Sequence, residues 1–257
     1  MSSQNVSFDR AAAFYDATRA LRPEVAGGLT DALEREVRAV GERVLEPGAG
    51  TGRIARPLAE RGIRVTGVDI APKMLEQFSA QMTTAYAPAD LLMGDATRLP
   101  FRDASFTAVM ACHLLHLVPE WRTAVAEMRR VLCPGGVILH HGEGESDRNR
   151  SPMMTAKIDE LLAARGFSRR RRPEVEEIRE GFRAEGGQVR TLIIAEWDDN
   201  GTLERHFVET RARAHSWTWE IPESIFYDMM DDFEAWIRAN IPDERHVLYE
   251  LDVWSFD

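Results

Sequence analysis

Between residues 43 and 141, segments that are typical of strands alternate with segments that are typical of helices. The five strand-like segments are RVLEP, RVTGVDI, LLMGDA, SFTAVMAC and GVILHH. They are apolar with little polar alternation, as expected for strands that are covered on both faces. Strands that alternate with helices pair in parallel and carry helices on both faces of the sheet. The sequence therefore predicts an α/β fold with a doubly wound, mostly parallel sheet.

The segments on either side of this region follow a different pattern. Helical patterns precede it, and helical patterns with two further strands follow it. At 257 residues the chain is long for one domain and short for two, so we expect one domain with an insertion. We assign the core to about residues 41–141, with strands at about 188–197 and 246–254, the last of them antiparallel. Residues 1–40 and 142–244 are expected to form a helical cap at the carboxyl edge of the sheet.

The first strand runs into a glycine-rich segment, RVLEPGAGTGRIA, that starts at residue 43. Gly48, Gly50 and Gly52 alternate here, and Glu46 precedes them. A strand, a glycine-rich turn and a helix together form a known nucleotide-binding device, because glycine lets a ligand approach the backbone. The three glycines alone are equally compatible with a tight turn that binds nothing. A nicotinamide dinucleotide site has the spacing Gly-x-Gly-x-x-Gly, whereas the sixth position here is Arg53.

Acidic residues follow the second and third predicted strands. Asp69 ends the second strand, where a carboxylate accepts hydrogen bonds from two ribose hydroxyls in nucleotide-binding folds. Asp95 lies at the tip of the third strand. Two carboxylates suit an adenosine ligand and would repel a pyrophosphate. The pattern therefore favours an adenosine-containing cofactor over a nicotinamide dinucleotide, and it argues against a nicotinamide oxidoreductase.

Four segments in order resemble the class I S-adenosylmethionine-dependent methyltransferases. They are VLEPGAGTGRIA, VTGVDIAPKML, GDATRLPFRDASFTAVMA and EMRRVLCPGGVIL. The likeness is greatest to the small-molecule branch that includes the ubiquinone/menaquinone-type C-methyltransferases. It covers about residues 8–141, and residues 142–244 match no motif of the family. The resemblance implies a Rossmann-like fold, S-adenosylmethionine as the cofactor, S-adenosylhomocysteine as its product, and a small-molecule methyl acceptor.

The resemblance also implies which residues bind the methionyl part of the cofactor. The backbone at Gly48, Gly50 and Gly52 would pass close to this part, and Glu46 would accept from its amino group. Cys112 ends the fourth strand, where its backbone would touch the ligand.

For the remainder of the cofactor, the resemblance implies that Asp69 binds both ribose hydroxyls and that Ile70 packs on the adenine. Asp95 would accept from the adenine amino group, beside the amide of Ala96. In the opening segment AAAFYDATR, Tyr15 and Arg19 would cover the cofactor and hold its carboxylate. The alternative for Arg19 is an ion pair with Asp16 on the surface.

Candidates for the acceptor side follow the fourth and fifth strands. Methyl transfer from a sulfonium is an in-line displacement in which the protein orients the reactants, and a general base assists a hydroxyl or an acidic carbon. His113 and His116 are the candidate bases, with a polar pocket wall as their alternative role. His141, Trp217 and Trp219 are candidate substrate contacts, the tryptophans having core packing as the alternative. We expect no metal site, because no third ligand has a spacing that fits the two histidines.

The charge of the chain limits the class of partner. Its formal net charge is −10, which disfavours binding to nucleic acid, although a local basic patch remains compatible with it. The first residues do not resemble a signal peptide and no apolar run is long enough to span a membrane, so we expect a cytoplasmic protein without a membrane partner. The alternatives are a regulatory protein that binds S-adenosylmethionine without catalysis and a nucleic-acid methyltransferase. The acceptor atom and the oligomeric state stay open.

Overall fold

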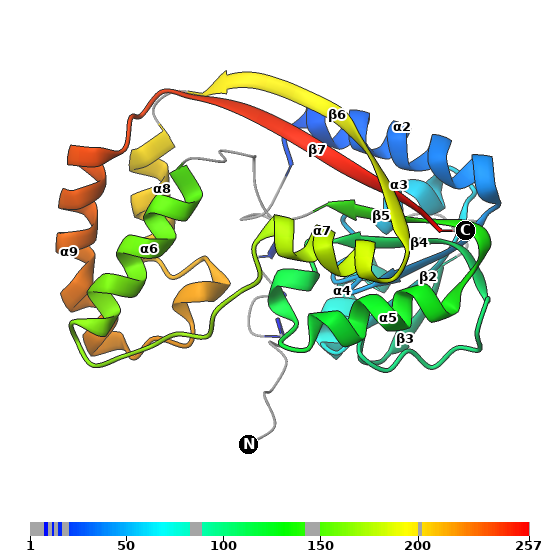
Figure 1. Ribbon diagram of the computed structural model, residues 1–257, viewed down its shortest axis with the longest axis horizontal. Helices are drawn as coiled ribbons and strands as arrows, with labels where there is room; N and C mark the ends of the chain where they lie inside the picture. Colours follow the sequence, from blue (N-terminus) through cyan, green and yellow to red (C-terminus); the bar gives the residue numbers. More distant parts are fainter. Residues whose placement is uncertain are drawn as a thin grey trace. The chain divides into compact units, whose positions relative to one another are not determined.

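The computed structural model in Figure 1 describes the chain in two compact units. Unit 1 comprises residues Met1–Glu143, Arg172–Ala195 and Glu250–Asp257, and unit 2 comprises Gly144–Arg171 and Glu196–Tyr249. The residues whose structure is described are 8–9, 12, 15–16, 21–82, 89–141, 150–199 and 202–256. Arg19 and most of the predicted first helix lie outside the described residues.

A seven-stranded sheet with the order β3-β2-β1-β4-β5-β7-β6 lies mostly in unit 1, and residues 196–199 of β6 and 245–249 of β7 belong to unit 2. Strands β1 to β5 pair in parallel, whereas β7 runs antiparallel to β5. The predicted doubly wound, mostly parallel sheet with an antiparallel C-terminal strand is therefore confirmed. The strands span Arg43–Pro47 (β1), Arg64–Asp69 (β2), Ala89–Met93 (β3), Phe106–Cys112 (β4), Leu132–His141 (β5), Gly187–Asp199 (β6) and Arg245–Phe256 (β7).

Helices lie on both sides of this sheet (Figure 1). One face buries Leu45, Val109 and Ile138 against α5 and α7, and α2 packs against β4 and β5. Because side chains alternate along a strand, neighbours such as Met110 and Leu139 turn to the other face, and both are fully buried. The helices of unit 1 span Pro23–Val40 (α2), Ala55–Glu60 (α3), Pro72–Gln81 (α4), Trp121–Val131 (α5) and Val175–Ala184 (α7).

Buried charges connect β7 to its neighbours. Asp252 in β7 accepts two hydrogen bonds from Arg179 of α7, at 2.7 and 2.9 Å, and one from Thr191 of β6, at 2.7 Å. The side chain of Asp252 is 4% exposed, and a buried carboxylate is stable only when such donors satisfy it. These hydrogen bonds fix the position of β7 relative to α7 and β6.

Unit 2 has an apolar core of its own. Its helices are α6 (Arg150–Ala163), α8 (Thr202–Arg211) and α9 (Glu223–Asn240), with a short 3-10 turn at Ser216–Thr218. Buried apolar side chains from all three helices fill the core, among them Leu162, Phe207, Met229 and Phe233. Unit 2 is thus mainly helical, as the sequence predicted. Its role as a cap stays a prediction, and α2 and α7, which the sequence analysis assigned to the cap, belong to unit 1.

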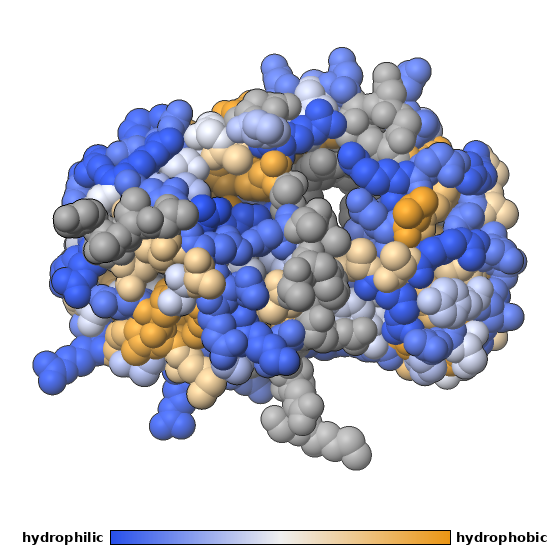
Figure 2. Space-filling view, turned by 180° about the vertical axis from the view of Figure 1, so that it is seen from behind, coloured by the Kyte–Doolittle hydropathy of each residue, from blue (hydrophilic) through white to orange (hydrophobic). Residues whose placement is uncertain are grey.

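The surface carries scattered apolar residues. The exposed large apolar side chains include Met93, Ile193 and Val208. The face shown in Figure 2 is mostly hydrophilic, with apolar residues in small patches. In the part of the chain that the structure describes, no helix is both long and apolar enough to cross a membrane.

Candidate cofactor site

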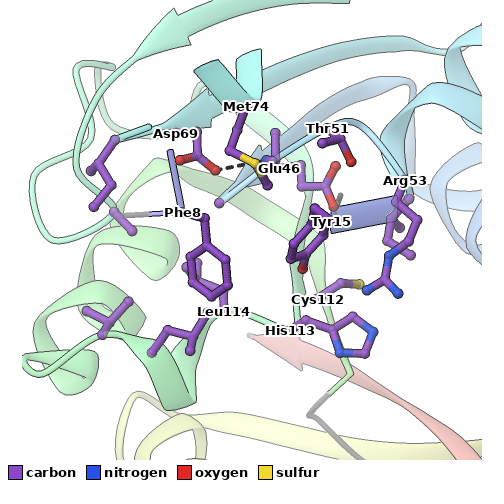
Figure 3. Close-up of a pocket in the computed structure, with 18 of the residues that line it drawn as sticks. Phe8, Tyr15, Glu46, Thr51, Arg53, Asp69, Met74, Cys112, His113 and Leu114 are labelled. Atoms are coloured by element: carbon purple, nitrogen blue, oxygen red, sulfur yellow. Dashed lines mark hydrogen bonds between the residues drawn. The ribbon is translucent and has the colours of Figure 1, made fainter. Parts of the chain in front are cut away.

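A pocket opens at the carboxyl ends of β1, β2, β3 and β4, within unit 1 (Figure 3). It holds about 800 Å³ of empty space, part of which is open to solvent. Parallel strands bring their carboxyl ends to one edge, so this is where an α/β sheet binds its ligands. The lining residues are Phe8, Tyr15, Glu46, Gly48, Ala49, Gly50, Thr51, Arg53, Ile54, Asp69, Ile70, Met74, Gly94, Asp95, Ala96, Cys112, His113, Leu114, Leu117 and Val118.

The loop after β1 presents bare backbone to this pocket. The amides of Gly48 and Ala49 donate to the carbonyl of Val68 in β2, at 2.7 and 3.1 Å, which fixes the loop over the sheet edge. Gly48 and Gly50 have φ of 71° and 55°, the left-handed region that favours glycine. A Cβ on Gly48 would also lie 2.6 Å from Leu114. Glycine at position 48 is thus favoured mainly by its conformation, because the end of the Leu114 side chain could move aside.

The third glycine has a different role. Gly52 also has a positive φ, 80°, but it does not line the pocket. A Cβ on Gly52 would lie 2.4 Å from the ring of Phe78, a fully buried residue of α4. Phe78 thus fills the space that a side chain at position 52 would take, and the predicted approach of the Gly52 backbone to the methionyl group stays a prediction.

Asp69 lies at the end of β2 with its carboxylate at the pocket. Its Oδ2 accepts a hydrogen bond from the amide of Gly50 and its Oδ1 one from the amide of Ala71, both at 2.8 Å (Figure 3 draws the first). Burial raises the pKa of Asp69, and these backbone donors oppose the rise. Each carboxylate oxygen accepts more than one hydrogen bond, so two ribose hydroxyls can still be bound.

Glu46 is a buried carboxylate that faces the same pocket. Its exposed fraction is 2%, and its Oε2 has no hydrogen-bond partner among the described residues. Burial raises the pKa of Glu46 well above its usual value, and the nearby charge of Arg53 opposes this rise. A buried acceptor without a donor is costly unless a ligand supplies one. Glu46 therefore fits a ligand with an ammonium group.

We expect Glu46→Gln to stabilise the ligand-free protein at pH 8 by about 1–3 kcal/mol, the cost of an unsatisfied buried group. The raised pKa means that the folded state binds more protons than the unfolded state. The free energy of unfolding of the wild type therefore falls as pH rises from the unfolded pKa through the folded pKa. The gain should shrink toward pH 5, where Glu46 is protonated to a greater extent in both states. Urea unfolding of the wild type and of Glu46→Gln at pH 8 and at pH 5 measures this gain in the free energy of unfolding. A Glu46→Gln variant that is no more stable than the wild type at pH 8 would contradict the prediction.

Asp95 and apolar residues line another part of the pocket. Asp95 follows β3, and its Oδ1 accepts from the amide and the hydroxyl of Thr97, both at 2.8 Å. This turn fixes the position of the Asp95 carboxylate in the pocket lining. Ile70, Met74, Ala96, Leu117 and Val118 line the pocket as well and give it apolar surface suited to an adenine ring.

Histidines follow β4 and end β5. His113 lines the pocket with a φ of 52°, and its amide donates to the carbonyl of His141 at 2.9 Å. The two rings meet edge to face with centroids 4.8 Å apart. His141 is buried outside the lining, and its Nδ1 lies 2.5 Å from the carbonyl oxygen of Glu250. Burial lowers the pKa of His141 to about 4, so its ring is neutral at neutral pH. His116 is also buried and does not line the pocket.

Aromatic residues and one arginine complete the lining. Tyr15 meets Phe8 edge to face at 5.6 Å, and the guanidinium of Arg53 lies 5.9 Å from the centre of the Tyr15 ring. In the sequence, Arg53 stands out only as a break in the dinucleotide pattern, and no motif singles out the apolar lining residues Met74, Leu114, Leu117 and Val118. Their position in the first turn after a strand was the available signal, because that turn lies at the ligand edge of the sheet.

The remaining candidates belong to unit 2. Trp217 is partly buried against the apolar core of that unit, and the indole of Trp219 donates to the carbonyl of Arg213 at 2.7 Å. Their role toward a substrate stays a prediction. The predicted role of Arg19 in holding the carboxylate of the cofactor stays a prediction as well. Among the described residues, no cluster of three or more His, Cys, Asp or Glu side chains is arranged to hold a metal ion.

Comparison of sequences assigns the core of unit 1 to a family. Residues 45–140 match the family described as a methyltransferase domain. A malonyl-(acyl-carrier protein) O-methyltransferase of Serratia marcescens is 38% identical over 133 residues, which are 52% of this chain and 49% of that protein. A demethylmenaquinone methyltransferase of Renibacterium salmoninarum is 40% identical over 99 residues, 38% of this chain and 40% of that protein. The chain thus spans about half the length of the curated relatives it matches, or less.

Solved structures with the same fold extend over nearly the whole chain. The cyclase SpnF has a TM-score of 0.61 at 20% identity and covers 97% of this chain and 93% of its own. Phosphoethanolamine N-methyltransferase 2 of Haemonchus contortus, solved in complex with S-adenosylmethionine, has a TM-score of 0.56 at 18% identity. It covers 96% of this chain and 57% of its own. Such identities establish the fold alone, whereas the sequence match identifies the domain. Residues 45–140 thus form a methyltransferase domain, and its fold is that of the class I S-adenosylmethionine-dependent methyltransferases.

Proposed function

We propose that the protein transfers a methyl group from S-adenosylmethionine to a small-molecule acceptor by in-line displacement. The observation that carries the proposal is the row of three carboxylates, Glu46, Asp69 and Asp95, in one pocket at the ends of β1, β2 and β3. An S-adenosyl ligand carries an ammonium, a ribose and an adenine in a corresponding order. The orphaned Oε2 of Glu46 supports an ammonium in particular.

The residues of the pocket have separate roles in this proposal. Asp69 binds the ribose hydroxyls, Asp95 and the amide of Ala96 bind the edge of the adenine, and Glu46 binds the ammonium. The backbone at Gly48 and Gly50 lets the methionyl chain lie close to the loop. When bound, the cofactor supplies a methyl group on a positively charged sulfur. The protein contributes orientation and exclusion of water, which are the main terms in such a displacement.

His113 is the residue that we expect to accept a proton from the methyl acceptor. It lies at the end of β4 in the pocket lining, and its backbone and ring are held against His141. A neutral imidazole there accepts the proton of a hydroxyl or an acidic carbon as the methyl group is transferred. His116 does not line the pocket, so we assign the role of proton acceptor to His113 alone. His141 then acts by positioning His113 rather than by touching the acceptor.

A small molecule is the acceptor class that the comparisons support. The relatives named above are a malonyl-(acyl-carrier protein) O-methyltransferase and a demethylmenaquinone methyltransferase, and another is named phosphatidylethanolamine N-methyltransferase. These names include both O- and N-methylation, so the acceptor atom is not carried over. The formal net charge of −10 disfavours nucleic acid. We propose that unit 2 sets the specificity for the acceptor, with Trp217 and Trp219 as its candidate contacts.

S-adenosylhomocysteine and S-adenosylmethionine should raise the melting temperature, and NAD should not. A ligand at one hundred times its Kd stabilises the folded state by about 2.7 kcal/mol. For a chain of this size each kcal/mol corresponds to about 2–4 °C. Calorimetric melting with each ligand measures the effect. Stabilisation by NAD without stabilisation by either S-adenosyl ligand would overturn the assignment of the pocket.

Transfer itself needs a second experiment. The protein is incubated with S-adenosylmethionine carrying an isotopically labelled methyl group and with a panel of hydroxy acids, acyl thioesters, quinols and amines. We expect the label in one acceptor class together with an equal amount of S-adenosylhomocysteine. Tight cofactor binding without S-adenosylhomocysteine formation across the panel would favour the regulatory alternative.

A further inference from the structure

We infer that the protein forms a symmetric homodimer in which the β6 strands of two copies pair antiparallel, with Ile193 on the two-fold axis. The sheets of the two copies would then join into one continuous sheet. The inference goes beyond the proposed function, because none of the residues that line the cofactor pocket belongs to β6. It assigns an interaction surface and the partner that fits it, a second copy of this chain.

The outer side of β6 is the first observation. The strand order of the sheet ends in β7-β6, so within the described residues β6 pairs with β7 on one side and with no strand on the other (Figure 1). The outer side of an edge strand presents amides and carbonyls that a further strand can bind. Natural edges are often protected by charged residues or proline, but the segment 191–195, TLIIA, contains neither. This stretch of β6 is therefore suited to accept a strand.

An exposed apolar side chain marks the middle of this stretch. Ile193 is 62% exposed although it lies in the interior of a strand of 13 residues. Val189 lies on the same face of β6 and is 36% exposed. An exposed apolar edge strand is a site at which chains associate. Covering Ile193 by a further strand would remove this apolar surface from water.

The sequence of β6 identifies the partner as a second copy. In an antiparallel pair around a two-fold axis at Ile193, a residue before Ile193 lies opposite the residue equally far after it in the other copy, on the same face of the sheet. Arg190 is thus opposite Glu196 of the second copy. Both lie three residues from Ile193 in one continuous strand, so their placement follows from strand geometry alone. The two-fold axis forms this attractive pair twice.

The residues between the two charges match as well. Leu192 would lie opposite Ile194 on the face that carries Arg190, again twice in each dimer. On the other face Thr191 would lie opposite Ala195, and Ile193 would lie opposite its own copy. Cross-strand pairs of apolar and β-branched residues stabilise a sheet. Every pair within residues 190–196 thus combines either opposite charges or two residues without charge.

Both charged groups are accessible for such a pair. The side chains of Arg190 and Glu196 are 55% and 64% exposed. Within the chain, Arg190 donates to Glu36 of α2 through Nη2, and Glu196 lies 3.8 Å from the ring of His246. A guanidinium has several N–H donors, so Arg190 can bind Glu36 and a second carboxylate together. Glu36 thereby holds the arginine at the edge of the sheet.

Neighbouring registers are less favourable. With the axis at Leu192, Arg190 would lie opposite Ile194. With the axis at Ile194, Glu196 would lie opposite Leu192. Each of these registers places a charge against an apolar side chain, twice in each dimer, and forfeits the pair of Arg190 with Glu196. The sequence of β6 thus favours the register centred on Ile193.

Sedimentation velocity of the full chain over a hundredfold range of concentration tests the dimer. Two strand edges bury less than the roughly 1,200–2,000 Å² of a standard interface, so we expect the mass to rise with concentration from one chain to two. Ile193→Lys places two ammonium groups at the axis and should weaken the dimer at least about tenfold. Met93→Lys is the matched control, because Met93 is 70% exposed in β3, at the other edge of the same sheet. It should leave the dimer unchanged.

Charge exchange tests the partner and the register. Arg190→Glu and Glu196→Arg should each weaken the dimer at least about tenfold, since each creates two pairs of like charge. An equimolar mixture of the two variants should dimerise again, because both pairs become attractive when an Arg190→Glu chain meets a Glu196→Arg chain. Thermal melting first checks that each variant is folded.

Ile193→Cys tests the axis even where a charge variant fails to fold. Opposite residues of an antiparallel pair have Cα atoms about 4.5–5.5 Å apart, which suits a disulfide. Oxidation with diamide should therefore link two Ile193→Cys chains. Met93→Cys and the wild type should stay unlinked, and they control for the native thiols of Cys112 and Cys133.

Four results would overturn the inference. A mass of one chain at every concentration would show that β6 does not bind a second copy. A dimer that Ile193→Lys does not weaken would place the interface elsewhere. A mixture of the charge variants that stays monomeric would exclude the register, and an Ile193→Cys chain that does not cross-link would exclude the axis. None of these results bears on the proposed function, which ligand binding and methyl transfer test.

Discussion

Asp69→Ala should weaken the binding of S-adenosylhomocysteine by at least about 100-fold. Each hydrogen bond to a charged carboxylate contributes about 1.5–3 kcal/mol, so two ribose hydroxyls together contribute about 3–6 kcal/mol. Since about 1.4 kcal/mol is a factor of ten, the lower bound is about 100-fold.

Asp69 also organises the protein, which adds to the expected effect. The amides of Gly50 and Ala71 both donate to it, so Asp69→Ala leaves two backbone donors at the pocket without their acceptor. From the sequence, Asp69 was expected to contact only the ligand. Asp69→Asn is the matched variant, because it keeps the shape and one carbonyl acceptor but removes the charge. Calorimetric titration and melting of both variants separate the two contributions. A folded Asp69→Ala variant with an unchanged Kd would remove Asp69 from the site.

Gly52→Ala should lower the free energy of unfolding by about 2–5 kcal/mol. A left-handed conformation costs an alanine about 1–2 kcal/mol, and overpacking typically adds about 1–3 kcal/mol. Both terms apply, because φ is 80° and the new Cβ would lie 2.4 Å from the ring of Phe78. Phe78 is fully buried in α4 and has little room to move aside.

Gly62→Ala is the control for this prediction. Gly62 has nearly the same φ, 84°, but nothing lies within 4 Å of the position that its Cβ would take. It should therefore cost only the conformational term, about 1–2 kcal/mol. Urea unfolding of both variants measures the difference, which isolates the contact with Phe78. Equal losses would show that Phe78 moves without cost. A Gly52→Ala variant that stays folded but fails to bind S-adenosylhomocysteine would support the predicted place of the Gly52 backbone in the binding site.

The arrangement of the sheet and of the acidic residues was predictable from the sequence. Apolar strands alternate with helices, and the carboxyl ends of parallel strands must meet, so Glu46, Asp69 and Asp95 were expected in one pocket. Proline in the first turn marked the starts of α2 and α4, because its missing amide is not needed there. These features depend on local chemistry and on the rule that the carboxyl ends of parallel strands meet at one edge of the sheet.

The sequence did not predict which individual side chains lie near the pocket and which are buried away from it. Alternation along a strand indicates that His140 and His141 face opposite ways, but not which of them is nearer the pocket. The pairing of β5 with β7 decides this: His140 lies near Asp252 and Phe182, and His141 meets His113. Gly52 likewise looked equivalent to its neighbours until α4 brought Phe78 against it. Such contacts join residues that are far apart in the chain, and no local pattern encodes them.

The order of the strands has a consequence for how the chain is made on the ribosome. β7 lies between β5 and β6 in the sheet, yet it is synthesised after both. Until it emerges, β5 presents an open edge of unpaired amides and carbonyls, and β6 has no neighbour in the sheet. During this time Arg179 and Thr191 cannot form their hydrogen bonds to Asp252, which lies in β7. Strands β1 to β5 can pair while the rest of the chain is still being translated, because domains form from the N-terminal side during synthesis. The nascent protein therefore carries an incomplete sheet while residues 142–244 are translated, and the arrival of one late strand both closes that edge and attaches β6.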